Sequence, residues 1–322
     1  MIPQFIARRI AQGILVVFLL SILSFAIINA APGDPAEALY GNMVDILTSA
    51  ERARIDRNLG IDKPLAVRYA IWAGNILKGD LGISYIEGRQ VKDILRERIP
   101  NTLLLFGCSI CLILLFSLLL GLKAGFNEGT WWDKFVSGLS VVFYAIPSFW
   151  LAIMAIMFFS VYLGILPSSG VRSIDGSGGP GDLAVHLAMP VAVMVIAHVG
   201  AYARFIQEKV KEQTKSHFVT AARANGMDER KLMRGIVKNA LVPFINYLGI
   251  TIPSFFGGSV MIETVFSWTG LGMLSAKAAN TRDYPLLMGT VFITGVMVVI
   301  CIMMTDILML VVNPALRKQV IR

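Results

Sequence analysis

Six long runs without any Asp, Glu, Lys or Arg are the feature that most restricts how this chain can fold. A helix needs about 20 apolar residues to cross the hydrocarbon core of a bilayer, and each run is about that long or longer. The chain is 56% hydrophobic and 16% charged, whereas soluble domains have about 45–50% apolar and about 25% charged residues. We therefore predict an all-α integral membrane protein with six transmembrane helices, at residues 10–31, 102–122, 135–166, 183–203, 241–262 and 286–305.

The first run follows Arg8 and Arg9 and has the outline of a secretory signal. Its uncharged stretch is longer than the about 7–15 residues of a signal core, and five further runs follow it. We therefore expect a membrane anchor that stays on the protein.

The charges between the runs predict which side of the membrane each connecting segment faces. Six spans place both ends of the chain on one side. The segments on that side carry 16 basic and 6 acidic residues, and those on the other side carry 13 basic and 14 acidic residues. Because Lys and Arg concentrate in cytoplasmic loops, we expect both termini in the cytoplasm. The net charge of +8 then reflects topology, and no nucleic-acid partner is expected.

This topology divides the chain into three parts. Residues 1–31 are a cytoplasmic end and the first span, residues 32–99 an extracytoplasmic cap, and residues 100–322 a five-span core. The core contains a long cytoplasmic segment, residues 204–240.

The extracytoplasmic cap carries ten basic and ten acidic side chains, so we expect a small soluble region. Two short helices are predicted in it. The first begins at a Thr48 or Ser49 cap and ends at Gly60, and the second begins at Pro64 and ends at Gly79.

The segment HFVTAARANGMDERKLMRGIVKNALVPF, residues 217–244, is basic, amphipathic and interrupted by one glycine. The residues before Asn225 favour a helix, and Gly226 ends it because glycine adopts the left-handed backbone. Asp228 then caps a second helix. That helix places basic residues at every fourth position on one side (Arg230, Arg234, Lys238) and apolar residues on another (Met233, Ile236, Val237, Ala240).

We therefore predict a helix-turn-helix at the membrane surface. The small residues Ala221 and Ala222 leave room for another surface to approach closely. The residues alone also allow a second interpretation, in which the lysines pair with anionic lipid.

Ala221, Ala222 and Gly226, with the later Pro243, resemble the "EAA" signature of permease subunits of ATP-binding-cassette importers. Thr220 stands where that signature has glutamate, and the proline comes later than usual. In both of these features the chain resembles the branch of the family that imports dipeptides, oligopeptides and nickel. Other stretches resemble the same branch along nearly the whole chain: APGDPAE, LGIDKPL, GDLGIS, ILPSSG, GGSVMIETVFSWTGLG, RDYPLL and NPALRK.

The resemblance implies the type I importer permease fold in the inner or plasma membrane of a prokaryote. It implies four kinds of partner: a second homologous permease, two ATPase subunits, an extracytoplasmic substrate-binding protein and the lipid bilayer. ATP and Mg would lie on the ATPase subunits, and this chain would bind no cofactor.

The resemblance also implies a coupling helix just before the glycine, which sits in a groove of the ATPase subunit. The residues expected to take part are Thr220, Ala221, Ala222, Arg223, Gly226 and Asp228. In the same family the loops around Glu263 and Asp283 contact the binding protein; the alternative for both residues is a solvated loop.

Four residues in the spans have two possible roles each. Asp306 is the only ionisable side chain expected well inside a span, where a charge costs about 2.5–3.5 kcal/mol. It either makes a helix-packing or subunit bond, or it belongs to the translocation path or gate. Pro147, Pro243 and Pro253 are expected to interrupt spans, either beside the pathway or as packing kinks.

The sequence has no G-x-x-x-x-G-K-[ST] loop, so we do not expect this chain to hydrolyse ATP. It also has no G-x-S-x-G or H-E-x-x-H motif, so an enzyme is not expected. A stand-alone carrier or channel, and a membrane sensor or scaffold, stay open as alternatives.

A metal site within this chain is not expected. His186 and His198 are twelve positions apart, about 18 Å along a helix. Cys108, Cys111 and Cys301 lie in apolar runs and are expected to pack as small hydrophobic side chains. The sequence leaves the transported substrate open between peptide, nickel and a metal chelate.

Overall fold

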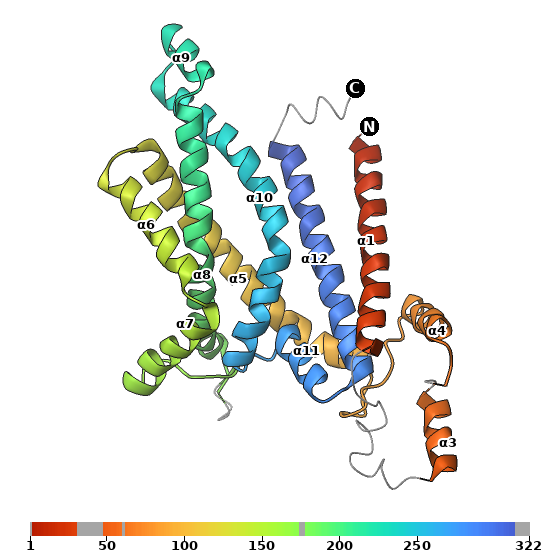
Figure 1. Ribbon diagram of the computed structural model, residues 1–322. Coiled ribbons are helices and arrows are strands. Elements are labelled where there is room, and N and C mark those ends of the chain that lie inside the picture. The colour runs from red at the N-terminus through yellow and green to blue at the C-terminus, as the bar shows by residue number, and fades with distance from the viewer. Residues whose placement is uncertain (1, 31–47, 60–61, 174–177, 313–322) are drawn as a thin grey trace. The chain divides into compact units, whose positions relative to one another are not determined.

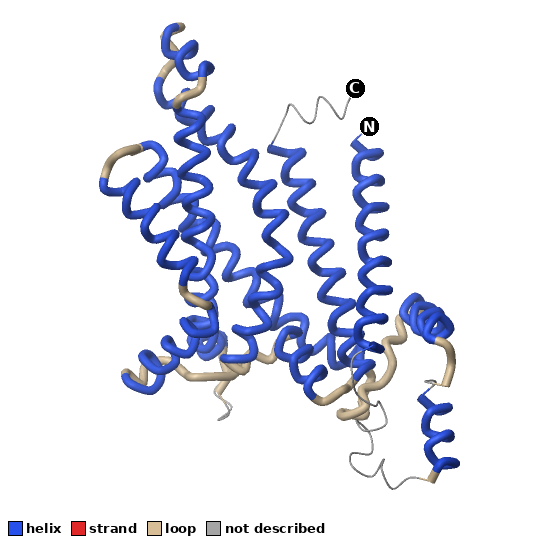
Figure 2. The backbone as a smooth tube through the Cα atoms, in the orientation of Figure 1, coloured by secondary structure: helices blue, strands red, loops and turns tan. Residues whose placement is uncertain are grey.

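The structure, a computed structural model, describes residues 2–30, 48–59, 62–173 and 178–312. Within these ranges every regular element is a helix, as Figure 2 shows, so the predicted all-α fold is confirmed. Gly60 and the stretches APGDPAE and NPALRK lie outside the described residues.

The chain packs into two compact units. Unit 1 comprises residues 1–9, 103–268 and 301–322, and unit 2 comprises residues 10–102 and 269–300. Three of the boundaries between the units fall within helices, in α1 (Ile2–Ala30), α5 (Val91–Phe126) and α12 (Tyr284–Val312), and the fourth, at residues 268/269, falls in the turn before Leu271. These units, which are defined by packing, do not coincide with the three parts predicted from topology, whose boundaries are at residues 31 and 99.

Among the described residues, five helices are long and apolar enough to cross a membrane. Their lengths range from 27 to 37 residues, so each exceeds the about 20 residues required. They are α1, α5, α8 (Pro180–Thr214), α10 (Glu229–Val265) and α12, and they can be followed in Figure 1.

The expected span at residues 135–166 is not one straight helix. α6 (Trp131–Ala145) ends before Pro147, and α7 (Ser148–Ala155) then continues into the π-helix η2 (Ile156–Tyr162). The two halves are bent by 91°. Pro147 is the physical reason, since a residue before proline is driven into an extended conformation, and Ile146 has φ −88° and ψ 120°. The part of the chain that the structure describes has six spans if this bent pair counts as one span.

Pro243 and Pro253 do not interrupt a helix, contrary to the prediction. Both lie inside α10, which continues through them for 37 residues. A proline removes one backbone hydrogen bond from the helix interior, and in a membrane neighbouring helices can compensate for that loss. Of the three prolines, only Pro147 therefore ends a helix.

Close helix contacts at glycines hold unit 1 together. A Cβ at Gly125 of α5 would lie 2.6 Å from the Cβ of Val210 in α8, and one at Gly121 would lie 2.7 Å from the Cβ of Ile206. Small residues let membrane helices approach closely without help from the hydrophobic effect. α8 also packs against α6, α7 and α10, so it is the central helix of this unit.

Unit 2 contains both short helices predicted in the cap. The first is α3 (Ser49–Leu59), and Thr48 caps it: the Thr48 N–H donates to Glu51 Oε2 at 2.9 Å, and the Glu51 N–H donates to Thr48 Oγ1 at 3.3 Å. This reciprocal pair is a capping box. The second is α4 (Leu65–Leu77), which follows Pro64.

The core of unit 2 lies between α5, α11 (Leu271–Asn280) and α12. A Cβ at Gly289 of α12 would lie 2.6 Å from a methyl carbon of Val91, so α12 and α5 are in close contact there. The buried side chains of this core are Val91, Ile94, Leu95, Leu271, Leu274, Ala278 and Leu286.

Candidate functional site

The predicted helix-turn-helix is present in unit 1. Helix α9 (His217–Ala224) lies beyond the end of α8 (Figure 1). Gly226 has φ +69° and donates its N–H to the Arg223 carbonyl at 3.0 Å, while the Met227 N–H donates to the Ala222 carbonyl at 3.0 Å. These two bonds form a Schellman motif. The predicted helix stop at this glycine is therefore confirmed.

Asp228 begins the next helix, as predicted. Its carboxylate accepts hydrogen bonds from the backbone N–H groups of Arg230 at 2.9 Å and Lys231 at 3.2 Å. A capping aspartate of this kind contributes about 1 kcal/mol to helix stability. The turn between α9 and α10 is thus fixed at both of its ends.

Helix α9 has a buried side and an exposed side. Val219 and Ala222 are 1% and 7% exposed and pack in one cluster with Leu232 and Ile236 of α10. Met233, which is predicted on the apolar side of the second helix, is 41% exposed. Thr220, Ala221 and Arg223 are among the exposed residues of α9, and together with Gly226, just after the helix, they are called the α9 face below.

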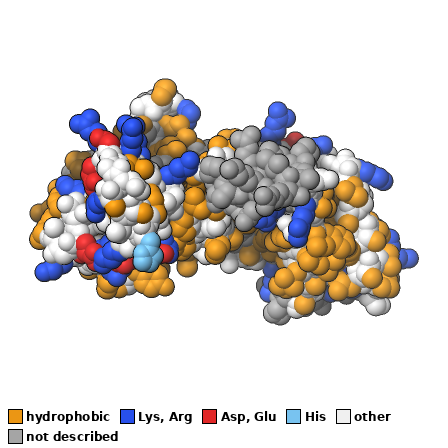
Figure 3. Space-filling model, turned by 90° about the horizontal axis from the view of Figure 1, so that it is seen from above, with side chains coloured by type: hydrophobic (Ala, Val, Ile, Leu, Met, Phe, Trp, Pro, Cys, Tyr) orange, Lys and Arg blue, Asp and Glu red, His pale blue; other side chains and the backbone are white. Residues whose placement is uncertain are grey.

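The α9 face combines small side chains with paired charge. Arg223 donates to Glu229 Oε1 at 2.7 Å, which raises the pKa of the guanidinium above its ordinary value. The predicted basic row of Arg230, Arg234 and Lys238 is exposed on α10. Seen end-on in Figure 3, lysine and arginine side chains alternate with acidic ones over this end of unit 1. The surface is therefore of mixed charge rather than a continuous basic patch.

The end of α8 that leads into α9 is joined to α6 by a polar cluster, called the α6–α8 clasp below. Lys211 Nζ lies 2.6 Å from Asp133 Oδ1. Gln207 is fully buried and donates from Nε2 to the Asp133 carbonyl at 2.9 Å. Nearby, Lys215 Nζ lies 2.8 Å from Glu128 Oε1 in the turn before α6. A displacement of α9 would thus be passed to α6 as well as to α8.

Asp306 has a partner of opposite charge. Its Oδ1 lies 3.3 Å from Arg9 Nη2, and its side chain is 22% exposed. The preceding residue, Thr305, is in close contact with α10, since a Cβ at Gly249 would lie 2.8 Å from Thr305 Oγ1. Of the two predicted roles, this geometry supports the packing bond between helices.

Glu263 and Asp283 do not lie in a solvated loop. Both residues are 0% exposed. The Asp283 carboxylate accepts hydrogen bonds from the Ser84 hydroxyl and from the backbone N–H groups of Tyr85 at 3.2 Å and Ile86 at 3.3 Å. Burial, and then this carboxylate, raises the pKa of the Tyr85 phenol. The arrangement argues against direct contact of either carboxylate with a binding protein, and it makes Asp283 an anchor for the loop before α5.

The two prolines predicted beside a pathway, Pro147 and Pro253, are both exposed. Pro253 belongs to a row of exposed residues three or four positions apart along α10, called the α10 stripe below: Asn246, Ile250, Pro253, Gly257 and Met261. That spacing keeps the row on one side of the helix. The row mixes polar, small and apolar residues, which is unusual for a face in contact with lipid.

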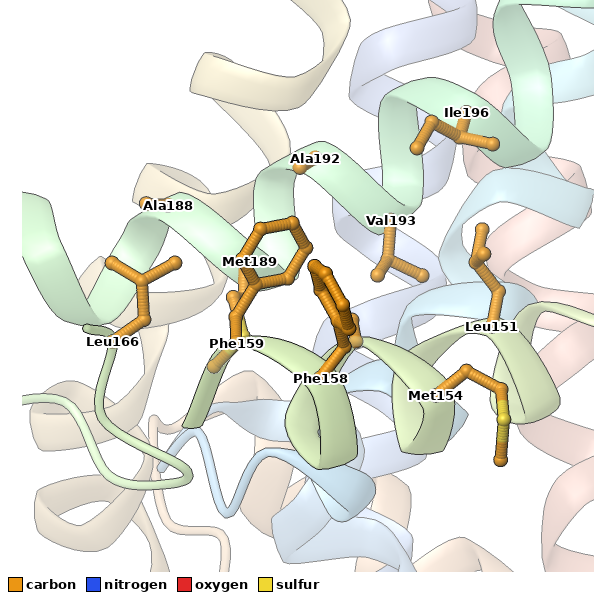
Figure 4. Close-up of a pocket in the computed structure, with 11 residues that line it drawn as sticks. Leu151, Met154, Phe158, Phe159, Leu166, Ala188, Met189, Ala192, Val193 and Ile196 are labelled. Carbon is orange, nitrogen blue, oxygen red and sulfur yellow. The ribbon is translucent and has the colours of Figure 1, made fainter. Parts of the chain in front are cut away.

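An apolar cavity of about 400 Å³ lies between α7, η2 and α8. Figure 4 shows Phe158 and Phe159 of η2 extending toward Met189 and Val193 of α8. Every lining side chain is Leu, Met, Ala, Phe, Val or Ile. Ligand sites usually add a few polar groups that orient the ligand. This cavity therefore offers no side-chain partner for the backbone of a peptide.

The histidines of α8 bond to their own helix. His186 Nδ1 lies 2.9 Å from the Asp182 carbonyl, and His198 Nδ1 lies 2.9 Å from the Met194 carbonyl. Among the residues that the structure describes, no three His, Cys, Asp or Glu side chains group closely enough to hold a metal ion.

Comparison with known proteins finds relatives along nearly the whole chain. The family model described as "Binding-protein-dependent transport system inner membrane component" matches residues 113–318, and the corresponding N-terminal model matches residues 1–106. The oligopeptide transport system permease protein AppB of Bacillus subtilis is 35% identical over 312 residues, which cover 96% of this chain and 98% of AppB.

Two further relatives are similar over a comparable length. A putative peptide permease protein of Brucella suis is 31% identical over 316 residues, which cover 98% of this chain and 99% of the relative. The metal-staphylopine import system permease protein CntB of Staphylococcus aureus is 30% identical over 316 residues, which cover 98% of each chain.

Proposed function

The chain belongs to the family of binding-protein-dependent transport system inner membrane components and is a permease subunit of an ATP-binding-cassette importer, and we propose that it imports peptides together with a second, homologous permease. It is a multi-pass membrane protein, and in this proposal it lies in a prokaryotic inner or plasma membrane with both termini in the cytoplasm. The charge asymmetry of the connecting segments supports that orientation.

Peptide is the substrate class that the relatives favour. AppB is named for oligopeptide transport and the Brucella suis relative for peptides, whereas CntB is named for a metal chelate. Uptake of labelled dipeptides, oligopeptides and metal chelates by cells with and without this chain distinguishes these classes.

The α9 face is the proposed docking site for an ATPase subunit. The observation that carries this proposal is the division of the alanine pair: Ala222 is 7% exposed and packs on α10, whereas Ala221 is exposed. A helix that is held from one side and small on the other can enter a groove without losing its own support. ATP and Mg lie on the ATPase subunits in this proposal. The contribution of this chain to the contact with an ATPase subunit is the docking helix.

Closure of the ATPase subunits would then move α9 and switch the permease between inward-open and outward-open states. A shift from 1:99 to 99:1 between two states requires about 5.5 kcal/mol of differential binding. A weakly held substrate does not supply that much free energy, so a nucleotide-driven partner is the appropriate motor. The α6–α8 clasp provides a route by which the movement reaches a second helix.

The test is Ala221→Trp in the assembled transporter, with Ala145→Trp as the matched control. Ala145 is also exposed, at the end of α6 away from the clasp. We expect Ala221→Trp to lower uptake at least about tenfold, equivalent to about 1.4 kcal/mol of docking free energy, with normal membrane insertion. The control should keep its uptake. Normal uptake and normal ATPase stimulation in Ala221→Trp would refute docking at this face.

The α10 stripe is the proposed lining of the pathway, and Pro253 belongs to it. Gly257 lies in the stripe, and a Cβ there would meet no atom within 4 Å. We therefore expect Gly257→Leu to fold normally and to reduce uptake of larger peptides more than that of dipeptides. Gly138→Leu in α6 is the control, because a Cβ at that position also meets no atom within 4 Å. Equal uptake by both variants for every peptide length would exclude the stripe from the pathway.

A further inference from the structure

Helix α4 is more apolar than expected for a helix of a soluble cap. Its sequence, LAVRYAIWAGNIL, contains one charged residue, and none of its residues is buried. An isolated helix of 13 residues is too short to span a bilayer, which needs about 20 residues. A short apolar helix with no buried residue requires another environment for its exposed side chains.

One side of α4 is attached to α1 and α12 within unit 2. The Tyr69 hydroxyl shares a hydrogen bond of 2.9 Å with the Ser21 hydroxyl of α1. The Phe25 ring lies 5.5 Å, centroid to centroid, from the rings of both Tyr69 and Trp72. Trp72 also makes an edge contact with Phe292 of α12 at 6.0 Å. Aromatic pairs in such geometries contribute about 0.5–1.5 kcal/mol each beyond their buried area.

These contacts fix the depth of α4 along α1. The uncharged part of α1, residues 10–30, is about 31 Å long at 1.5 Å per residue, which matches the about 30 Å hydrocarbon core. On the same scale Phe25 lies about 8 Å, and Ser21 about 14 Å, inside the end at Ala30. Figure 1 shows α4 beside the last third of α1 rather than beyond its end. The helix is therefore at a level that lipid occupies.

The other side of α4 is an exposed apolar stripe. Val67 and Ile71 are 44% and 45% exposed, and Leu77 at the end of the helix is 89% exposed. At the same level of α1, Leu23 and Ile27, on the side of the helix away from Phe25, are 61% and 59% exposed. The stripe thus lies at the same level as exposed apolar side chains of a transmembrane helix.

We propose that α4 is an interfacial membrane helix whose stripe lies in the lipid leaflet at the Ala30 end of α1. Helices of this type lie in the plane of the membrane with their apolar side about 5–10 Å deep. Tyr and Trp are enriched at that level, and Tyr69 and Trp72 attach the helix there. Lys78 and Gly79, which has φ +78°, end the helix and lead the chain away. In the orientation proposed above this is the outer leaflet.

Lipid is favoured over a protein partner by the depth and by the chemistry of the stripe. A water-exposed binding protein does not reach side chains beside Phe25. The stripe residues Val67, Ala70 and Ile71 are apolar, so their side chains cannot fix a partner's orientation by hydrogen bonds. A second permease subunit is the remaining alternative, and the experiment below separates it from lipid.

The test is site-directed spin labelling of the complete transporter in phosphatidylcholine–phosphatidylglycerol liposomes. Cys108, Cys111 and Cys301 are first replaced by alanine, and Ile71→Cys or Lys78→Cys is then labelled with a nitroxide. We expect the label at position 71 to be relaxed more strongly by oxygen than by a water-soluble nickel chelate. The label at position 78 should show the opposite order.

Two results would overturn the proposal. Stronger relaxation by the nickel chelate at position 71 would place the stripe in water. Weak relaxation by both reagents at that position would mean that protein, such as the second permease, covers it. Val67→Cys is measured in parallel, because it lies on the same stripe and provides the same readout if Ile71→Cys does not assemble.

Discussion

Lys211 Nζ lies 2.6 Å from Asp133 Oδ1, and this ion pair joins the last turn of α8 to the first turn of α6. The two side chains are only 15% and 13% exposed. The pair lies at the end of α8 that leads into α9. The pair is therefore placed to keep α6 and α8 together when α9 is displaced.

We expect Lys211→Ala to lower the free energy of unfolding by roughly 2 kcal/mol, less than the about 3–5 kcal/mol for a fully buried pair, because it leaves Asp133 without its cation. Lys209→Ala is the control, since Lys209 and Glu212 form an exposed pair at 2.7 Å on the same helix. Thermal unfolding of the purified transporter measures both. Equal stability of the two variants would show that the Lys211–Asp133 pair does not stabilise the contact between α6 and α8.

The Lys211→Asp, Asp133→Lys double exchange provides a second test of the same pair. If the contact transmits movement, the exchange should recover most of the ATPase-coupled uptake that either single change loses. Failure of the exchange to recover uptake, with normal folding, would indicate that the pair has only a structural role.

Adding one methyl group at Gly125 is expected to lower the free energy of unfolding substantially. A Cβ there would lie 2.6 Å from the Cβ of Val210 and 2.9 Å from the carbonyl oxygen of Gln207, so Gly125→Ala must separate α5 from α8. We expect a loss of about 1–3 kcal/mol in the free energy of unfolding. Gly107 lies in the same helix, and a Cβ added at that position would meet no atom within 4 Å.

Gly107→Ala should therefore be neutral or stabilising by up to about 1 kcal/mol, because alanine loses less backbone entropy in a helix. The two variants are compared by thermal unfolding of the transporter in one detergent. A destabilisation of similar size in both would mean that the α5–α8 contact is not specifically tight.

The local features of the site could be predicted from sequence, since their causes lie within a few residues. The turn at Gly226 needs only a positive φ and neighbouring carbonyls, and the cap at Asp228 needs only the next N–H groups. The bend at Pro147 likewise follows from the proline ring. Pro243 and Pro253 gave the same local signal, yet α10 continues through them, because tertiary packing in a membrane overrides a single lost hydrogen bond.

Long-range features could not be predicted in the same way. The partners of Asp283 lie almost 200 positions earlier in the chain, at residues 84–86, so the residues around Asp283 predicted only that it lies in a loop. The pairing of Asp133 with Lys211 in the α6–α8 clasp could not be predicted either, since both are ordinary charged residues near span ends. Helix α4 was assigned to a soluble cap because its neighbours in the sequence are charged.

Asp283→Ala should detach the loop before α5. It removes acceptors for the Ser84 hydroxyl and for two partly buried backbone N–H groups, and each unsatisfied donor costs about 1–3 kcal/mol. Asp93→Ala is the control, because Asp93 is exposed. Limited proteolysis is expected to cut the loop at residues 84–86 much faster in Asp283→Ala than in the control. Equal cleavage rates would show that Asp283 does not anchor the loop.

Arg9 and Asp306 test whether the acidic residue of α12 has a packing role or a gating role. Their charged atoms are 3.3 Å apart, and an unpaired charge within a span costs about 2.5–3.5 kcal/mol. Arg9→Gln should therefore reduce the amount of assembled transporter, and Asp306→Asn should reduce it less, because Arg9 is the more exposed of the two side chains. Quantitative immunodetection of the membrane fraction measures this amount.

The combination Arg9→Gln, Asp306→Asn removes both charges at once and distinguishes the two roles. For a packing bond, assembly and uptake should both return close to normal, because no unpaired charge remains in the span. For a gate, assembly should return while uptake per assembled transporter stays low, because the ionisable group that controls the path is missing. Since Thr305, the neighbour of Asp306, also packs against Gly249, we expect the first outcome: the pair holds α1 and α12 together at the level where α12 contacts α10.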